Sequence, residues 1–168
     1  MTIIQLKICL LGDFAVGKTS LIRQFVEGRF DDKYLTTIGV KISQKNIELN
    51  GNQISILIWD IAGGEDIVRN RQSYLRGASG ALIVGDLSRQ ETISQLAHYQ
   101  EQLHTISPGA KVVVLGNKID LVAKREEVAK KLEETAYTLG AVSLLTSAKT
   151  GENVEKAFEI LNQAMRPK

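Results

Sequence analysis

Residues 12–19 have the sequence Gly-Asp-Phe-Ala-Val-Gly-Lys-Thr, which fits the pattern G-x-x-x-x-G-K-[ST]. An apolar segment at 3–11 precedes it and predicts a strand, and an amphipathic segment at 20–27 follows it and predicts a helix. In such a unit the glycines permit a tight turn, and backbone N–H groups point at a phosphate group. Lys18 adds positive charge there, and the Thr19 hydroxyl can bind Mg²⁺. The stretch therefore predicts a phosphate-binding loop in an α/β fold.

Short apolar segments alternate with longer amphipathic ones along the chain, which is typical of an α/β fold. The segments that predict strands are 3–11, 42–49, 54–59, 81–84, 111–115 and 142–145. Those that predict helices are 20–27, 91–106, 124–139 and 153–165. Asn50-Gly51 predicts a hairpin, which adds one antiparallel edge strand. We predict one domain over residues 1–168, with a six-stranded, mostly parallel sheet and about five flanking helices.

Composition and charge exclude several classes of protein. Hydrophobic residues make up 43% and charged residues 24%, which argues against a disordered or coiled-coil chain. The net charge of +2 gives no reason to expect nucleic acid or anionic lipid as a partner. Cys9 is the only cysteine, which excludes a disulfide framework and a cysteine-built zinc site within one chain. No signal peptide or membrane-spanning run is evident, so we expect a cytoplasmic monomer.

A second motif, Asn117-Lys118-Ile119-Asp120, follows the predicted strand at 111–115. The Asp120 carboxylate can accept two hydrogen bonds from the N1–H and N2–H₂ edge of guanine, whereas adenine presents no such donor pair. Because the motif lies on the same sheet edge as the phosphate-binding loop, it favours a guanine nucleotide. Ser147-Ala148-Lys149 follows another predicted strand and could complete the base pocket. An ATP-using enzyme is the more distant alternative, and competition between GTP and ATP would separate the two.

With these elements the sequence resembles the small GTPases of the Ras superfamily over essentially its whole length. It is most similar to the Rab branch, which has counterparts, in order, of GDFAVGKTSL, YLTTIGV, WDIAGGE, SYLRGA, GNKIDL and TSAK. The resemblance implies a P-loop NTPase fold of the Ras-like G-domain type and a Mg²⁺-dependent switch that hydrolyses GTP to GDP. It also implies effector proteins that bind switch I around Thr37 and switch II from Asp60 to Gln72, and an exchange factor and a GTPase-activating protein.

The resemblance also assigns roles to individual residues. Phe30 would stack on the guanine side, with plain core as the alternative, and Tyr34 would cover the phosphates, with plain surface as the alternative. The residues implied for nucleotide binding are Ala15, Val16, Gly17, Lys18, Thr19, Ser20, Phe30, Tyr34, Thr37, Gly63, Asn117, Lys118, Asp120, Ser147, Ala148 and Lys149. Those implied for the metal are Thr19, Thr37 and Asp60, and those for catalysis are Lys18, Thr37, Gly63 and Gly64.

The main departure from the family is Gly64, which stands where the string D-x-x-G-Q-E has the glutamine that orients the attacking water. Phosphoryl transfer depends on such placement. A misplaced reactant costs on the order of 10²-fold, or about 2.7 kcal/mol, so we expect slow intrinsic hydrolysis. Three interpretations stay open. They are a slow GTPase, a GTPase rescued by a partner in trans, and a GTP- or GDP-binding module with negligible turnover.

Further departures from the family lie in the phosphate-binding loop, directly after switch I and at the end of the sequence. Phe14 occupies a position that is usually small in the family, where its ring could cover the γ-phosphate or point outward onto switch II. Val40-Lys41-Ile42 replaces the Rab-like V-D-F, although Trp59 and Tyr74 retain two aromatic positions that Rab effectors contact. The sequence shows no prenylatable cysteine up to Lys168. A trimmed tail, a protein without a lipid anchor as in bacterial Rab-like proteins, and the GTPase domain of a larger Roco-type protein are the alternatives. Membrane association is expected only with a lipidated tail.

Overall fold

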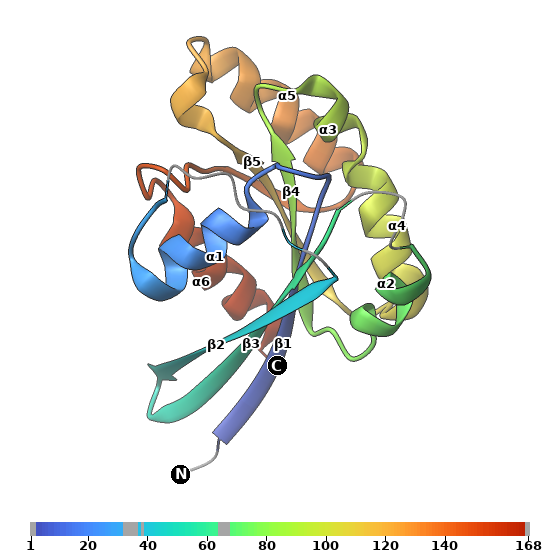
Figure 1. The fold of residues 1–168 in the computed structure, drawn as a ribbon, viewed down its shortest axis with the longest axis vertical. Coiled ribbons are helices and arrows are strands. Elements are labelled where there is room, and N and C mark those ends of the chain that lie inside the picture. Colours follow the sequence, from blue (N-terminus) through green and yellow to red (C-terminus); the bar gives the residue numbers. More distant parts are fainter. Residues whose placement is uncertain (1–2, 32–36, 38, 64–67, 167–168) are drawn as a thin grey trace.

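A six-stranded sheet with helices on both faces forms the fold (Figure 1). The computed structural model describes residues 3–31, 37, 39–63 and 68–166, without the side chains of 68–71. The strands are β1 (Ile3–Leu11), β2 (Val40–Leu49), β3 (Asn52–Ile61), β4 (Gly80–Asp86), β5 (Lys111–Asn117) and β6 (Val142–Leu145). Their order is β2-β3-β1-β4-β5-β6, and only the β2–β3 pair is antiparallel among these strands. This confirms the predicted mostly parallel sheet with one antiparallel edge strand.

The helices divide between the two faces of the sheet (Figure 1). The helices α1 (Lys18–Glu27) and α6 (Val154–Met165) cover one face. The other face is covered by α2 (Val68–Leu75), α3 (Gln90–Ser94), α4 (Leu96–Ile106) and α5 (Arg125–Thr138). No helix in the described part of the chain is long and apolar enough to cross a membrane.

The alternation of β1 supplies both halves of the core. Ile8 and Leu10 face the cluster under α1 and α6, whereas Cys9 and Leu11 face the cluster under the other helices. This is the period-2 pattern of a central strand that is buried on both faces. The burial of Cys9 raises its thiol pKa to about 12, so this thiol stays protonated at neutral pH.

The predicted hairpin is confirmed by its backbone. Asn50 and Gly51 have φ angles of 53° and 77°, and the flanking Leu49 and Asn52 pair across the two strands. Two consecutive residues with positive φ match the twist of the strands, and glycine and asparagine adopt that conformation at low cost. The turn fixes the register of β2 against β3. The C-terminal end of β3 then lies with the carboxyl ends of the other parallel strands.

Two expectations about local structure were wrong. The predicted helices leave out the segment 61–72, whose sequence has no clear periodicity, but α2 begins at Val68. This helix is mostly polar, with Leu75 as a buried residue, so its sequence carries little helical period. The segment 91–106 was expected to be one helix, but Gln95 separates α3 from α4 because its N–H bonds to the Ile93 carbonyl instead of continuing the α-helical ladder.

The stack of Phe25 and Phe158 between α1 and α6 gives a test of the core. The ring centroids lie 3.8 Å apart, with an interplanar angle of 3°. Because Phe158 is 1% exposed, Phe158→Ala should leave a cavity and lower the free energy of unfolding by about 3–5 kcal/mol. Denaturant unfolding measures this loss. Tyr137→Ala is the matched control, because Tyr137 is 87% exposed and its loss should change stability by less than about 0.5 kcal/mol. Equal losses in the two variants would contradict the assignment of the core.

Candidate functional site

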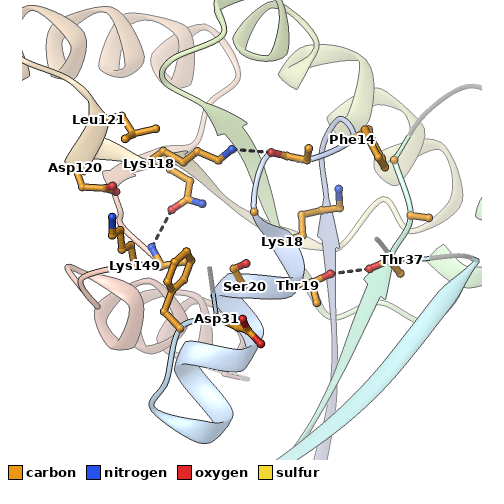
Figure 2. A pocket seen from close by; sticks show the side chains of 17 residues that line it. Phe14, Lys18, Thr19, Ser20, Asp31, Thr37, Lys118, Asp120, Leu121 and Lys149 are labelled. Atoms are coloured by element: carbon orange, nitrogen blue, oxygen red, sulfur yellow. Dashed lines mark hydrogen bonds between the residues drawn. The ribbon is translucent and has the colours of Figure 1, made fainter. Parts of the chain in front are cut away.

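A cavity of about 320 Å³ opens at the carboxyl ends of the parallel strands, which is where open α/β sheets bind ligands. Its place follows from the strand order. β1 is central, with β3 on one side and β4 on the other, so the loop after β1 lies where the strand order reverses. Figure 2 shows Lys18 and Thr19 at one end of the cavity and Asp120 and Lys149 at the other. Its lining residues are Phe14, Ala15, Gly17, Lys18, Thr19, Ser20, Phe30, Asp31, Thr37, Ala62, Gly63, Asn117, Lys118, Asp120, Leu121, Ala148 and Lys149.

The cavity brings together most of the residues predicted to hold a nucleotide. Val16 and Ser147 do not line it, and both are fully buried. Tyr34 and Gly64 lie outside the described residues. The lining residues without a predicted binding role are Phe14, Asp31, Ala62 and Leu121. Each of these is the chain neighbour of a predicted residue, and that adjacency is the signal that could have identified it.

The Lys18 ammonium lies at the base of one end of the cavity and is only 6% exposed as a residue. Its Nζ donates to the carbonyls of Gly12 at 2.9 Å and Asp13 at 3.0 Å. These bonds hold the cation beside the loop that leads into the N-terminus of α1. A buried cation next to a helix N-terminus is a favourable position for an anionic group such as phosphate.

The N-K-x-D segment holds two further carbonyls of the same loop. Asn117 Nδ2 donates to the Val16 carbonyl at 2.9 Å, and Lys118 Nζ donates to the Ala15 carbonyl at 2.9 Å. Asn117 Oδ1 in turn accepts a bond from Thr146 Oγ1 at 3.1 Å. The segment therefore ties the base end of the cavity to the phosphate end. That contact is invisible in the sequence, where about 100 residues separate the partners.

Two glycines allow this close packing. Gly17 has a φ of 103°, and a Cβ at this position would lie 2.3 Å from Asn117 Nδ2. Gly63 lies so close to the loop that a Cβ would come within 2.4 Å of the Gly12 carbonyl oxygen. Both distances are shorter than a real Cβ contact allows. The site therefore requires glycine here for space, and at Gly17 also for its backbone conformation.

Oxygen ligands suited to a divalent cation converge beside Lys18. Thr19 Oγ1 lies 2.6 Å from Thr37 Oγ1 and donates to Asp60 Oδ2 at 2.5 Å, and Thr37 Oγ1 lies 3.1 Å from the same oxygen. Asp60 is 1% exposed, and its Oδ1 is buried without a hydrogen-bond partner among the described residues. A buried, half-paired carboxylate next to two hydroxyls fits Mg²⁺, which takes one or two carboxylates together with hydroxyl, water or phosphate oxygens. The three residues predicted as metal ligands thus lie together.

Asp120 is held in place at the opposite end of the cavity. Its Oδ1 accepts a hydrogen bond from Ser147 Oγ at 2.7 Å, and the same Ser147 oxygen accepts from the Thr150 N–H at 3.1 Å. Asp120 itself is exposed and lines the cavity. This arrangement orients a carboxylate toward the space that a base edge with two N–H donors would fill.

Two phenylalanines lie on the cavity wall. Phe30 is half-buried, lines the cavity and also packs against the core cluster under α1 and α6, so it combines both of its predicted alternatives of site residue and core residue. Phe14 is 48% exposed and lines the end that holds Lys18 and Thr37 (Figure 2). Phe14 therefore forms part of the cavity wall at this end while half of its surface stays exposed.

The fold and the cavity define a P-loop nucleotide-binding protein with an α/β architecture. Comparison with family models gives the particular group, because the model of the Ras family matches residues 7–167. The chain belongs to the Ras family and is a small GTPase of the Ras superfamily, with the Ras-like G-domain fold. Members of this family bind guanine nucleotides as switches and act with regulators and effectors.

The Asp120 geometry gives a test of base recognition. Asp120→Asn replaces an acceptor-only carboxylate with an amide that can donate, so it should weaken GDP binding by about 100-fold or more and raise affinity for the xanthine nucleotide, which has a carbonyl at that edge. Competition binding with both nucleotides measures this exchange. Glu133→Gln makes the same chemical change on the exposed surface of α5 and should alter neither affinity. Unchanged GDP binding in Asp120→Asn would contradict the proposed orientation of the base.

Proposed function

We propose that this chain is a Rab-like guanine-nucleotide switch that binds GTP and GDP with Mg²⁺ and hydrolyses GTP slowly. The observation that carries the proposal is the phosphate end of the cavity. There the buried Lys18 lies beside the cluster of Thr19, Thr37 and Asp60. Positive charge, the N-terminus of α1 and metal-binding oxygens at one place suit a nucleoside triphosphate.

The residues of the chain would divide the work of phosphoryl transfer as follows. Lys18 and the N–H groups of the loop bind the β- and γ-phosphates and favour the charge that develops on their oxygens. Thr19, Thr37 and Asp60 would hold Mg²⁺, which when bound neutralises charge between the two phosphates. Gly63 lies against the loop backbone and lines the cavity, and the family resemblance implies that its N–H contacts the γ-phosphate. Each of these groups binds or orients, and none forms a covalent bond.

Slow turnover is inferred from the side chain that the sequence lacks. At position 64 a glycine offers no group to orient the attacking water. The loss of such placement is worth on the order of 10²-fold in rate. Glu65 is the next residue and could be considered as a substitute for the missing glutamine. A carboxylate beside the γ-phosphate would, however, be repelled by it.

Phe14 is expected to limit how far an activating partner can accelerate hydrolysis. Its ring lines the phosphate end of the cavity while remaining 48% exposed. A cationic side chain inserted by an activating partner would have to pass this ring. We therefore expect weak stimulation by a partner that acts through an inserted arginine, unless the ring is displaced.

The Rab-like assignment rests on sequence motifs and on one surface. Trp59 and Tyr74 are half-buried, with ring centroids 6.3 Å apart, and both pack on the core cluster under α2 to α5. Ile42 pairs with Trp59 across β2 and β3 and is 49% exposed. We propose that effectors contact these apolar groups beside Lys41, in a cytoplasmic protein that acts as a monomer and a single domain.

Single-turnover hydrolysis tests the proposed rate. The protein is loaded with GTP and Mg²⁺ and compared with Gly64→Gln, Phe14→Gly and the double variant. We expect a slow unmodified protein, and up to about 10²-fold faster hydrolysis in Gly64→Gln, because the restored side chain can orient water. The double variant should be at least as fast, since it also opens the phosphate end.

The outcome separates the two candidate functions. Ala97→Gln adds the same side chain on the exposed surface of α4, away from the cavity, and should leave the rate unchanged. If all variants hydrolyse at background while GTP remains bound, the chain is a GTP- or GDP-binding module without useful turnover. If the unmodified protein is already fast, the assignment of a missing water-orienting group is wrong.

A further inference from the structure

We propose that Arg89 and Tyr99 are positioning residues that hold the crest of the phosphate-binding loop and thereby slow the release of nucleotide. This inference rests on the nucleotide-binding function proposed above. Neither side chain lines the cavity, and neither belongs to the motifs that predict the site. Both contact the loop from outside the cavity lining.

Arg89 joins the loop to a buried carboxylate. Its Nη2 donates to the Phe14 carbonyl at 2.7 Å, and its Nε donates to Asp86 Oδ2 at 3.1 Å. Asp86 ends β4 and is 1% exposed. Its Oδ1 accepts from the Ser88 N–H at 2.9 Å and from the Ser88 hydroxyl at 2.6 Å. The guanidinium is therefore fixed at both ends, by the carboxylate and by the loop.

The same carboxylate orients a second cation. Lys118 Nζ lies 2.9 Å from Asp86 Oδ2 and donates to the Ala15 carbonyl at 2.9 Å. Burial on its own raises the pKa of Asp86, but the hydrogen bonds from Ser88, Lys118 and Arg89 outweigh it and hold that pKa below its usual value. Asp86 therefore stays charged at neutral pH. One buried anion aims two cations at consecutive carbonyls of the loop.

Tyr99 adds a contact from α4. It is 3% exposed, and its hydroxyl donates to Asp13 Oδ1 at 2.7 Å. The carbonyl of Asp13 is already held by Lys18, so both ends of this residue are fixed. Asp13, Phe14 and Ala15 form the crest of the loop, and each is held by a side chain from a different part of the chain.

The crest needs these contacts because its backbone is in a rare conformation. Ala15 has a φ of 62°, in the left-handed region that residues with a Cβ seldom adopt. Such conformations persist when the surroundings determine them more strongly than local preference does. Carbonyls that are bonded to side chains leave successive N–H groups available for an anion. If the holding contacts are lost, we expect the N–H groups to lose their aim and the phosphates to leave faster.

The test is the dissociation rate of a fluorescent GDP from the full chain with Mg²⁺ present. Removing a hydrogen bond to a charged group costs enough to predict release about 10- to 100-fold faster in Arg89→Ala. Tyr99→Phe deletes only the hydroxyl and should release GDP about 5- to 10-fold faster. Arg89→Lys keeps the charge but cannot bridge two acceptors as the planar guanidinium does, so it should restore only part of the retention.

Matched controls and a second readout separate positioning from general destabilisation. Arg76→Ala and Tyr137→Phe make the same changes at exposed positions outside the cavity and should stay within about twofold of the unmodified protein. The preference for GDP over inosine diphosphate, which lacks the 2-amino group that Asp120 would read, should not change in Tyr99→Phe. A loop-positioning role affects the phosphate end alone, whereas a general loosening would lower this preference as well.

Each outcome decides between the alternatives. Faster release with an unchanged preference for GDP supports the proposal, and Tyr99→Phe and Arg89→Lys supply this result even if Arg89→Ala fails to fold. Release unchanged in Arg89→Ala and Tyr99→Phe, or release that rises together with a loss of base preference, overturns it. If the unmodified protein does not retain GDP, the proposed function fails first. That result is distinct, because it appears before any variant is compared.

Discussion

The site depends on where the carbonyls of residues 12–16 point. All five accept hydrogen bonds from side chains, given by Lys18, Arg89, Lys118 and Asn117. A peptide group has its carbonyl and N–H on opposite sides, so carbonyls that are already bonded to side chains leave the N–H groups available to a ligand. If the loop carbonyls accepted hydrogen bonds from N–H groups of the same loop, those N–H groups would not be available to a ligand. The cavity can therefore bind an anion because side chains satisfy the carbonyl half of the backbone, Lys18 from the same loop and Arg89, Asn117 and Lys118 from distant parts of the chain.

The fold provides these side chains through the ends of its parallel strands. β4 and β5 end at Asp86 and Asn117, which pair in register at the edge where the loop after β1 also emerges. These ends lie on one side of the sheet because the strands run parallel. The right-handed crossovers that make this possible place the helices on the faces of the sheet. Base recognition, phosphate binding and the support behind the loop thus share one sheet edge.

Much of the fold and the site could be predicted from the sequence, because the relevant signals are local. Asn50-Gly51 fixed the hairpin, and the alternation of apolar segments gave the strands, although polar ends such as Asp86 hid their full length. The roles of Arg89 and Tyr99 could not be predicted, since their partners in the loop lie 75 and 86 residues away and no short pattern encodes the contact. Position 64 shows the reverse case, because the sequence states the missing side chain while that residue lies outside the described structure.

We propose that the loop N–H groups and Lys18 bind the phosphates and supply most of the affinity for nucleotide. The direct measurement is calorimetric titration of the nucleotide-free protein with GDP and with guanosine, under the same Mg²⁺ and salt. The account predicts that GDP binds at least about 10³-fold more tightly, since several charge-assisted hydrogen bonds are worth more than about 4 kcal/mol together. Equal affinity for guanosine and GDP would contradict it, because the base end alone would then account for binding.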